Sequence, residues 1–267
     1  MREFAVDRAG VKLAVRIDGA DDPAAPTIVF AHALGTSMRI WDQTIADLPD
    51  GLRIVRFDLR GHGQSDAPDG PYAMGALVAD AEAICDAAKM RDALFVGLSV
   101  GGMIGQGLAI KRLDLVRALV LSNTAAKIGN AQLWQDRIAI VKRDGMPALA
   151  DAVLARWFSP AFLASPDVTP WREMLLATDP EGYTGVCAAI AGTDFYTPTS
   201  GLRLPTLGIA GSEDRATPPD LVRETVDLIP GSEFRLMRKT GHLPCVEHPS
   251  EYAAILTSFA EKTGHLR

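Results

Sequence analysis

Short apolar segments alternate with longer amphipathic segments along most of this chain. A run of four to eight apolar residues is typical of a buried strand, and a longer segment with a period of 3.6 residues indicates a helix. Strands are predicted at 27–33, 53–59, 93–96, 116–122, 204–211 and 233–237, and helices at 38–48, 74–90, 103–110, 218–229 and from 249 onward. Strands that alternate with helices predict an α/β fold, with a mostly parallel sheet covered by helices on both faces.

The first two segments have a different pattern. Residues 2–7 and 11–17 alternate between polar and apolar positions on either side of Arg8-Ala9-Gly10. This alternation predicts an antiparallel hairpin with one buried face, at an edge of the sheet.

The strand pattern is interrupted in the middle of the chain. Residues 123–200 show only helix-like segments, which contain Trp134, Trp157 and Trp171. We therefore predict a core formed by residues 1–122 and 201–267, with 123–200 inserted as a helical lid. Sheets of this kind place their binding sites at the carboxyl ends of the strands, so the lid is expected to cover that edge.

Composition narrows the class of protein. The chain has 267 residues, of which 48% are hydrophobic and 22% charged, with a net charge of −6. This acidic balance offers no basic surface for nucleic acid or an anionic membrane. No apolar run resembles a signal peptide or a membrane span, so a cytoplasmic location is expected. Cys85, Cys187 and Cys245 lack metal-site spacing, and we interpret them as buried hydrophobic residues in a protein without a metal.

One motif carries the chemistry. A predicted strand ends at Gly97-Leu98-Ser99-Val100-Gly101, and a helix is predicted to follow. Gly-x-Ser-x-Gly between a strand and a helix is the nucleophile elbow of the α/β-hydrolases. Small residues on both sides of the serine allow the strand and the helix to approach closely. The alternative is a glycine-rich turn with an ordinary exposed serine.

A serine nucleophile needs a base and an acid that orients the base, in the order Ser…Asp/Glu…His. His242 follows the last predicted strand, where the base is expected. Asp214 is favoured as the acid because it follows a strand and precedes the helix start at Thr217-Pro218, with Glu213 in reserve. Three other histidines are interpreted differently: His32 and His62 as loop-fixing residues, and His248 as the start of the final helix.

An oxyanion hole completes such a site. We expect the backbone N–H of Val100 and that of Leu34, in the loop after the 27–33 strand, to form it. Asp58, Arg60 and Asp66 lie in nearby loops, and we interpret them as structural residues that brace each other.

Several longer motifs of this chain resemble those of a known superfamily. The elbow, His32-Ala33-Leu34-Gly35, Asp58-Leu59-Arg60-Gly61-His62-Gly63 and Gly241-His242 together resemble the α/β-hydrolase superfamily. The lid resembles the 3-oxoadipate enol-lactonase family, in Ser122 to Gly129, Trp134, Arg137-Ile138, Gly145-Met146, Ala155 to Phe158, Met174-Leu175, Thr178 to Tyr183 and Cys187 to Ile190. The resemblance implies hydrolysis of a five-membered enol-lactone in the β-ketoadipate route of aromatic breakdown, through a serine acyl-enzyme and without a cofactor.

Such a lactone carries a free carboxylate, which needs a cationic partner in a pocket away from water. Trp134 and Arg137 lie about 60° apart around the predicted helix of residues 131–143. We therefore expect Arg137 to bind the carboxylate and Trp134 to cover the ring, with Arg156 as the next candidate.

Two alternatives to the enol-lactonase function remain. The protein could be another serine hydrolase (a carboxylesterase, a perhydrolase or a C–C bond hydrolase) or a lactone receptor of the same fold. The sequence leaves the oligomeric state open.

Overall fold

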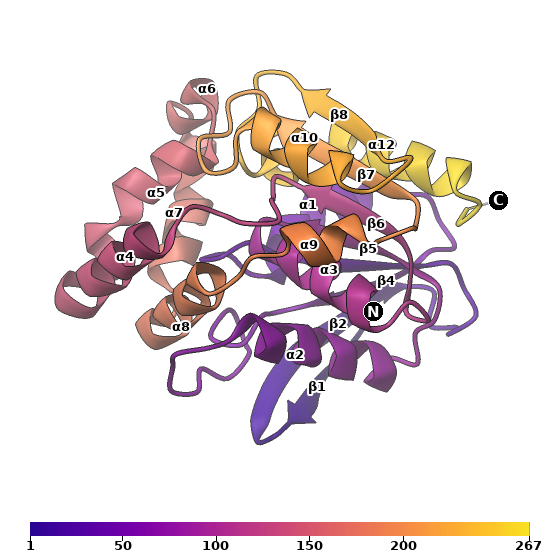
Figure 1. Cartoon of the computed structure of the whole chain (residues 1–267), viewed down its shortest axis with the longest axis horizontal. Coiled ribbons are helices and arrows are strands. Elements are labelled where there is room, and N and C mark those ends of the chain that lie inside the picture. Colours follow the sequence, from indigo (N-terminus) through magenta and orange to yellow (C-terminus); the bar gives the residue numbers. More distant parts are fainter. Residues whose placement is uncertain (267) are drawn as a thin grey trace.

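Eight strands form one sheet in the computed structural model, which describes residues 1–266 (Figure 1). Their order across the sheet is β1-β2-β4-β3-β5-β6-β7-β8. β1 and β2 are antiparallel to each other, β2 is antiparallel to β4, and all other neighbours are parallel. The strands are β1 (Arg2–Arg8), β2 (Val11–Gly19), β3 (Thr27–Ala31), β4 (Arg53–Phe57), β5 (Ala93–Leu98), β6 (Val116–Ser122), β7 (Thr206–Gly211) and β8 (Glu233–Met237).

The burial of the strands explains their sequence patterns. Every residue of β3, β4, β5 and β7 is buried. β3, β5 and β7 are accordingly nearly continuous apolar runs, whereas β4 also buries Arg53 and Arg56. The predicted hairpin is confirmed: Arg2 pairs with Ile17 and Arg8 with Val11. Ala9 and Gly10 both have positive φ, at 53° and 82°, as a two-residue hairpin turn of type I′ requires.

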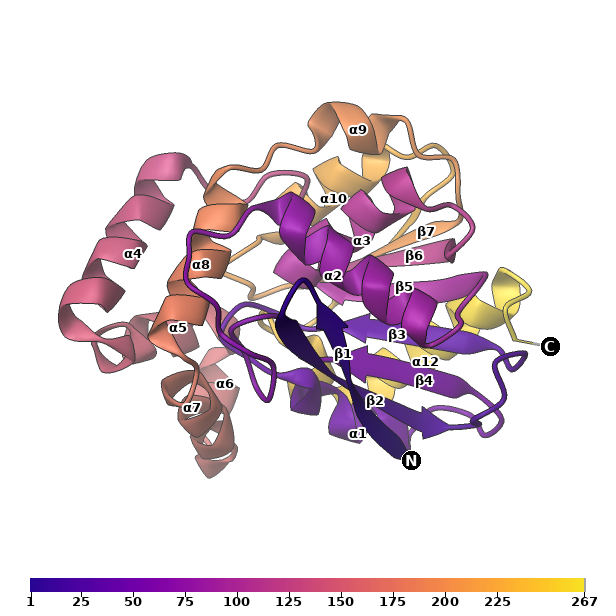
Figure 2. The ribbon, with the colours of Figure 1, turned by 90° about the horizontal axis from the view of Figure 1, so that it is seen from below.

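Helices cover both faces of the sheet (Figure 2). α2, α3 and α10 lie on one face, and α1 and α12 lie on the other. The predicted helix at 38–48 is shorter than expected, because it starts as a 3₁₀ turn at Met38–Trp41. The helices of the core are α1 (Asp42–Ala46), α2 (Met74–Ala87), α3 (Val100–Lys111), α10 (Pro219–Asp227), α11 (Pro244–Glu247) and α12 (Pro249–Lys262).

The segment between β6 and β7 is helical, as predicted, and within residues 1–266 it contains no strand. α4 to α8 lie together beside the sheet, whereas α9 lies near α3 (Figures 1 and 2). The helices of this segment are α4 (Ala131–Asp144), α5 (Ala150–Trp157), α6 (Pro160–Leu163), α7 (Thr169–Leu176), α8 (Pro180–Ala191) and α9 (Tyr196–Ser200). The division into a core and a lid at 123–200 stays a prediction. Among the described helices, none combines the length and the apolar character needed to cross a membrane.

Candidate active site

Ser99 lies in a sharp turn between β5 and α3. Its φ is 58° and its ψ is −120°, a strained conformation for a residue with a side chain. A Cβ added to Gly97 would lie 2.3 Å from the Gly101 oxygen, and one added to Gly101 would lie 2.2 Å from the Ala31 oxygen. Glycine is therefore required at both positions of the motif. The helix begins at Val100, three residues before its predicted start.

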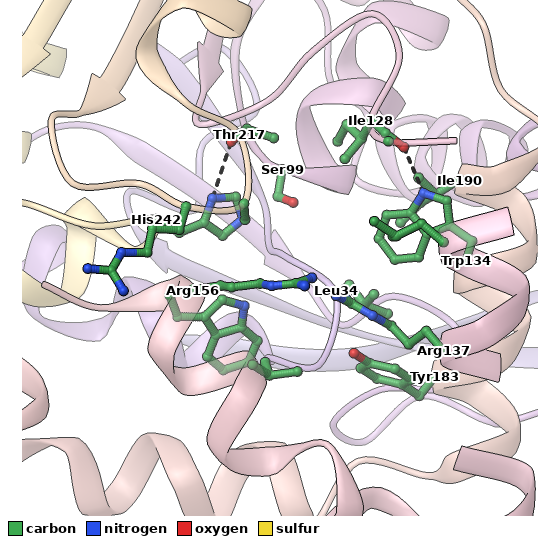
Figure 3. A pocket seen from close by; sticks show the side chains of 16 residues that line it. Leu34, Ser99, Ile128, Trp134, Arg137, Arg156, Tyr183, Ile190, Thr217 and His242 are labelled. Carbon is green, nitrogen blue, oxygen red and sulfur yellow. Dashed lines mark hydrogen bonds between the residues drawn. The ribbon is translucent and has the colours of Figure 1, made fainter. Parts of the chain in front are cut away.

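The structure brings His242 and Asp214 together. His242 Nδ1 lies 2.8 Å from Asp214 Oδ2, and both residues are buried. The other ring nitrogen of His242 remains available for a second partner, and Figure 3 shows the ring beside Ser99. Within residues 1–266, no hydrogen bond joins Ser99 to His242. Such bonds often tighten only when the substrate binds.

Four further hydrogen bonds hold the Asp214 carboxylate. The Ala216 and Thr217 N–H groups donate to Oδ1 at 2.7 and 3.0 Å, and the Thr217 hydroxyl donates to Oδ2 at 2.9 Å. Asn123 Nδ2 donates to Oδ2 at 2.8 Å. Burial alone would raise the pKa of Asp214, but the charge of His242 and these hydrogen bonds hold this pKa below its ordinary value. Asp214 is therefore ionised at neutral pH.

Asn123 and the hydroxyl of Thr217 were not predicted as parts of the site. Asn123 follows β6 directly and has a φ of 46°, a conformation that asparagine tolerates better than most residues. An asparagine at the end of a buried strand was the available sequence signal. Glu213, the reserve candidate, does not line the cavity that contains Ser99 and His242.

The backbone N–H groups of Val100 and Leu34, near Ser99, have no acceptor within the described chain. Val100 is the first residue of α3, so its N–H points out of the helix. The Gly35 N–H, by contrast, donates to His62 Nε2 at 2.9 Å. This bond leaves Leu34 as the better donor in its loop, in agreement with the expected oxyanion hole, whose role stays a prediction.

The interpretation of His32 and His62 as loop-fixing residues is confirmed. His32 Nε2 accepts the Leu59 N–H at 2.9 Å, and His62 Nε2 accepts the Gly35 N–H. A ring nitrogen that accepts a hydrogen bond cannot carry a proton, so both rings are neutral. Burial lowers the pKa of His32 to about 4 and that of His62 to about 3.

These two histidines predict acid sensitivity. In the unfolded chain they bind protons below about pH 6.5, but in the folded protein only below about pH 4 and pH 3. Because the unfolded state binds more protons in this window, stability falls as the pH falls. The two groups together should lower the free energy of unfolding by about 4 kcal/mol between pH 7 and pH 5. Urea unfolding at both pH values measures this loss.

His62→Gln should reduce the difference between pH 7 and pH 5 by about 2 kcal/mol. His248→Gln is the matched control, because His248 is exposed. An unchanged pH difference in His62→Gln would contradict the prediction.

The charged loop residues have structural partners, but not the expected ones. Arg60 forms two hydrogen bonds with Asp80, at 2.5 and 2.6 Å, instead of pairing with Asp58 or Asp66. Asp58 accepts the Met38 and Gln64 N–H groups, and Asp66 accepts the Lys12 N–H. The three residues are therefore structural, as expected, but their side chains do not brace each other. Arg60 and Asp66 bond to distant segments, and Asp58 bonds to Met38 and to Gln64 of its own loop.

Ser99 and His242 line a cavity of about 220 Å³ under the helical segment. Most of its wall is apolar, and three arginines but no carboxylate line it. The lining residues are Leu34, Ser99, Ile128, Gly129, Leu133, Trp134, Arg137, Val153, Arg156, Trp157, Tyr183, Ile190, Arg215, Ala216, Thr217 and His242.

Trp134 and Arg137 both line this cavity, as predicted. Trp134 Nε1 donates to the Ile128 oxygen at 2.7 Å, which fixes the indole (Figure 3). The Arg137 guanidinium lies 4.8 Å from the centre of the Trp134 ring, a cation–π contact. Arg156 points toward Arg137 (Figure 3). Burial and the charge of Arg137 lower the pKa of Arg156. Two like charges therefore face each other without an acidic partner among the lining residues.

The loop that carries His242 is hydrogen-bonded to the end of α5. The His242 N–H donates to the Trp157 oxygen at 2.6 Å. Glu247 accepts the Gly241 N–H at 2.7 Å and also the N–H and hydroxyl of Ser159. The position of His242 thus depends on the same helix that carries Arg156, a link that the sequence did not indicate.

The three cysteines are buried, as predicted. Burial raises the pKa of Cys85 and that of Cys187 to about 12, so neither thiol is a nucleophile at neutral pH. Within the described part of the chain, no group of three or more His, Cys, Asp or Glu side chains could hold a metal ion.

Comparison with known proteins agrees with this geometry. Residues 26–249 match a family described as alpha/beta hydrolase fold. The chain is 34% identical to "3-oxoadipate enol-lactonase 2" of Acinetobacter baylyi over 85% of both chains, and 32% identical to "3-oxoadipate enol-lactonase 1" of that organism over 96% of this chain and 95% of the relative. The crystal structure of the enol-lactonase from Burkholderia xenovorans LB400 superimposes with a TM-score of 0.92 at 35% identity, over 97% of this chain and all of that one. This chain is a hydrolase-fold protein that belongs to the α/β-hydrolase family and, within it, to the 3-oxoadipate enol-lactonase family.

Proposed function

We propose that this protein hydrolyses 3-oxoadipate enol-lactone to 3-oxoadipate, a step of the β-ketoadipate route of aromatic breakdown. The observation that carries the proposal is the pair of arginines, Arg137 and Arg156, in the cavity that contains Ser99. An apolar cavity with unneutralised cations suits a small ring that bears a carboxylate. The names of the relatives support the same substrate.

In the proposed mechanism, His242 takes the proton of the Ser99 hydroxyl as Ser99 attacks the lactone carbonyl. Asp214 holds the His242 ring and stabilises its charged form. The N–H groups of Val100 and Leu34 bind the oxyanion, and one such donor is worth about 3–4 kcal/mol. The carbon–oxygen bond of the ring then breaks, His242 returns the proton to the enol oxygen, and the enol tautomerises to the ketone.

A second half-reaction releases the product. His242 takes a proton from water, and the resulting hydroxide attacks the acyl-enzyme. The bond to Ser99 breaks, and the serine recovers its proton from His242. The new carboxylic acid releases its proton to solvent, so the product leaves as a dicarboxylate, one charge more negative than the lactone.

Turnover of the enol-lactone, followed by its ultraviolet absorbance, tests this proposal against neutral aryl esters. A kcat/KM for the lactone well above that for the esters is expected. Equal values would indicate a general carboxylesterase. Lactone binding without multiple turnover would indicate a receptor.

The role of Arg137 has its own test. Arg137→Met should raise KM for the enol-lactone by about 10- to 150-fold, because a hydrogen bond to a charged group is worth about 1.5–3 kcal/mol. KM for a neutral aryl ester should not change. Arg143→Met is the matched control, since Arg143 lies on the same helix but is exposed and paired with Asp144. Equal losses on both substrates would mean that Arg137 is structural, and Arg156 would then be tested in the same way.

A further inference from the structure

Tyr183 has a buried hydroxyl that no residue of the described chain satisfies. The side chain, on α8, is 1% exposed, and its hydroxyl has no hydrogen-bond partner. The residue lines the same cavity as Ser99 and His242. Figure 3 shows it beside Arg137, with the hydroxyl directed toward the interior of the cavity.

An unsatisfied buried hydroxyl is costly, at about 1–3 kcal/mol, so its persistence beside a cavity indicates a missing partner. Burial raises the pKa of Tyr183, which keeps the phenol protonated at neutral pH. The hydroxyl can therefore both donate its proton and accept a hydrogen bond. Its charged neighbours, Arg137 and Arg156, carry only donors, so they can satisfy the oxygen of Tyr183 but not its proton. These three side chains form a cluster of donors whose missing partner is an acceptor.

The position of Tyr183 is fixed by close packing. A Cβ added to its neighbour Gly182 would lie 2.3 Å from the Gly61 Cα, so α8 contacts a core loop backbone to backbone. Tyr183 Cε2 lies 3.1 Å from the position of a Cβ added to Gly35. Gly35 follows Leu34, the expected oxyanion donor. The hydroxyl is therefore held at a set place relative to the loop where the acyl group would react.

We propose that Tyr183 is a substrate-binding residue that donates its hydroxyl proton to the carboxylate of the ligand, together with Arg137 and Arg156. This subsite would select compact ligands whose carboxylate binds these three side chains while an acyl group elsewhere in the same ligand lies near Ser99. The inference rests on the proposed function only for the identity of the substrate. The class of ligand that the subsite binds, a short carboxylate, follows from the donor cluster itself.

Tyr183→Phe tests the proposal by removing a single oxygen atom. KM for the enol-lactone should rise about tenfold, with kcat changed less than twofold. Hydrolysis of a neutral aryl ester should not change. Adipate, a six-carbon dicarboxylate, should inhibit ester hydrolysis by the wild-type protein competitively, and its inhibition constant should also rise about tenfold in the variant.

Tyr252→Phe is the matched control. Tyr252 is also fully buried and its hydroxyl is also unpartnered, but it does not line the cavity. Its substitution should change none of these values. Both variants should unfold at the wild-type temperature or above, because each loses an unsatisfied polar group.

The outcomes of these experiments distinguish the proposed enol-lactonase function from the role proposed for Tyr183. If the wild-type protein does not turn over the enol-lactone but adipate inhibition depends on the Tyr183 hydroxyl, the proposed function is wrong and the carboxylate subsite stands. If adipate does not inhibit the wild-type protein, or if Tyr183→Phe leaves its inhibition constant unchanged, the inference is overturned. Equal losses on the lactone and the neutral ester would also overturn it.

Discussion

Replacement of Ser99 with alanine is expected to abolish nearly all hydrolysis. Removal of the nucleophile from a catalytic triad typically lowers kcat by several powers of ten. Alanine keeps the Cβ, so the strained backbone at φ 58° and the packing of β5 against α3 remain as they are. The variant should therefore fold with unchanged stability. Steady-state kinetics and thermal unfolding measure the two properties independently.

Ser258→Ala provides a control for the loss of a serine hydroxyl, since Ser258 is exposed on α12. It should retain full activity. A folded Ser99→Ala protein that kept about a tenth of the wild-type rate would refute the assignment of the nucleophile.

Asp214→Asn should lower kcat by about 10⁴-fold. An ionised carboxylate accepts a hydrogen bond from the N–H at His242 Nδ1 and so leaves the other nitrogen free to act as the base. An amide that presents its NH₂ group to Nδ1 favours the opposite tautomer.

The lowered pKa of Asp214 means that the wild-type carboxylate stabilises the fold above its unfolded pKa of about 3.8. This contribution to stability is lost as the pH falls through the pKa of Asp214 in the folded protein, which lies below 3.8.

The kinetic loss in Asp214→Asn should far exceed any loss of stability at pH 7, because the backbone N–H groups of Ala216 and Thr217, which donate to Oδ1, can still bond to the amide oxygen. Glu213→Gln is the matched control and should be nearly neutral. If Glu213→Gln is the damaging change and Asp214→Asn is mild, the acid is misassigned. Measurement of kcat at pH 7 for both purified variants distinguishes Asp214 from Glu213 as the acid.

The sequence alone predicted the parts of this molecule that depend on local chemistry. Buried parallel strands need apolar runs, and the hairpin of β1 and β2 needs alternation because only one of its faces is buried. The elbow was recognisable because its two glycines are required by close backbone contacts, that of Gly97 with Gly101 and that of Gly101 with Ala31 on the neighbouring strand β3. Asp214 and His242 each follow the end of a strand, which is where chain order in this fold places the acid and the base.

Tertiary structure decided how residues from distant segments meet. Arg60 pairs with Asp80 on α2, Asn123 reaches Asp214 across the end of the sheet, and Glu247 connects the His242 loop to Ser159. Periodicity places a residue on a face of its helix but does not say which neighbour that face meets. That depends on helix orientation, which packing sets.

The donor cluster is the clearest case. Arg137, Arg156 and Tyr183 come from α4, α5 and α8, and the sequence suggested the two arginines only as alternatives. They meet because α8 contacts the core through Gly182 and Gly61, while the end of α5 is bonded to the His242 loop. Charge repulsion between the arginines opposes this arrangement, so it persists only because packing elsewhere stabilises it. The sequence therefore determined which chemistry the chain carries, and the packing of three helices determined which side chains face the candidate nucleophile.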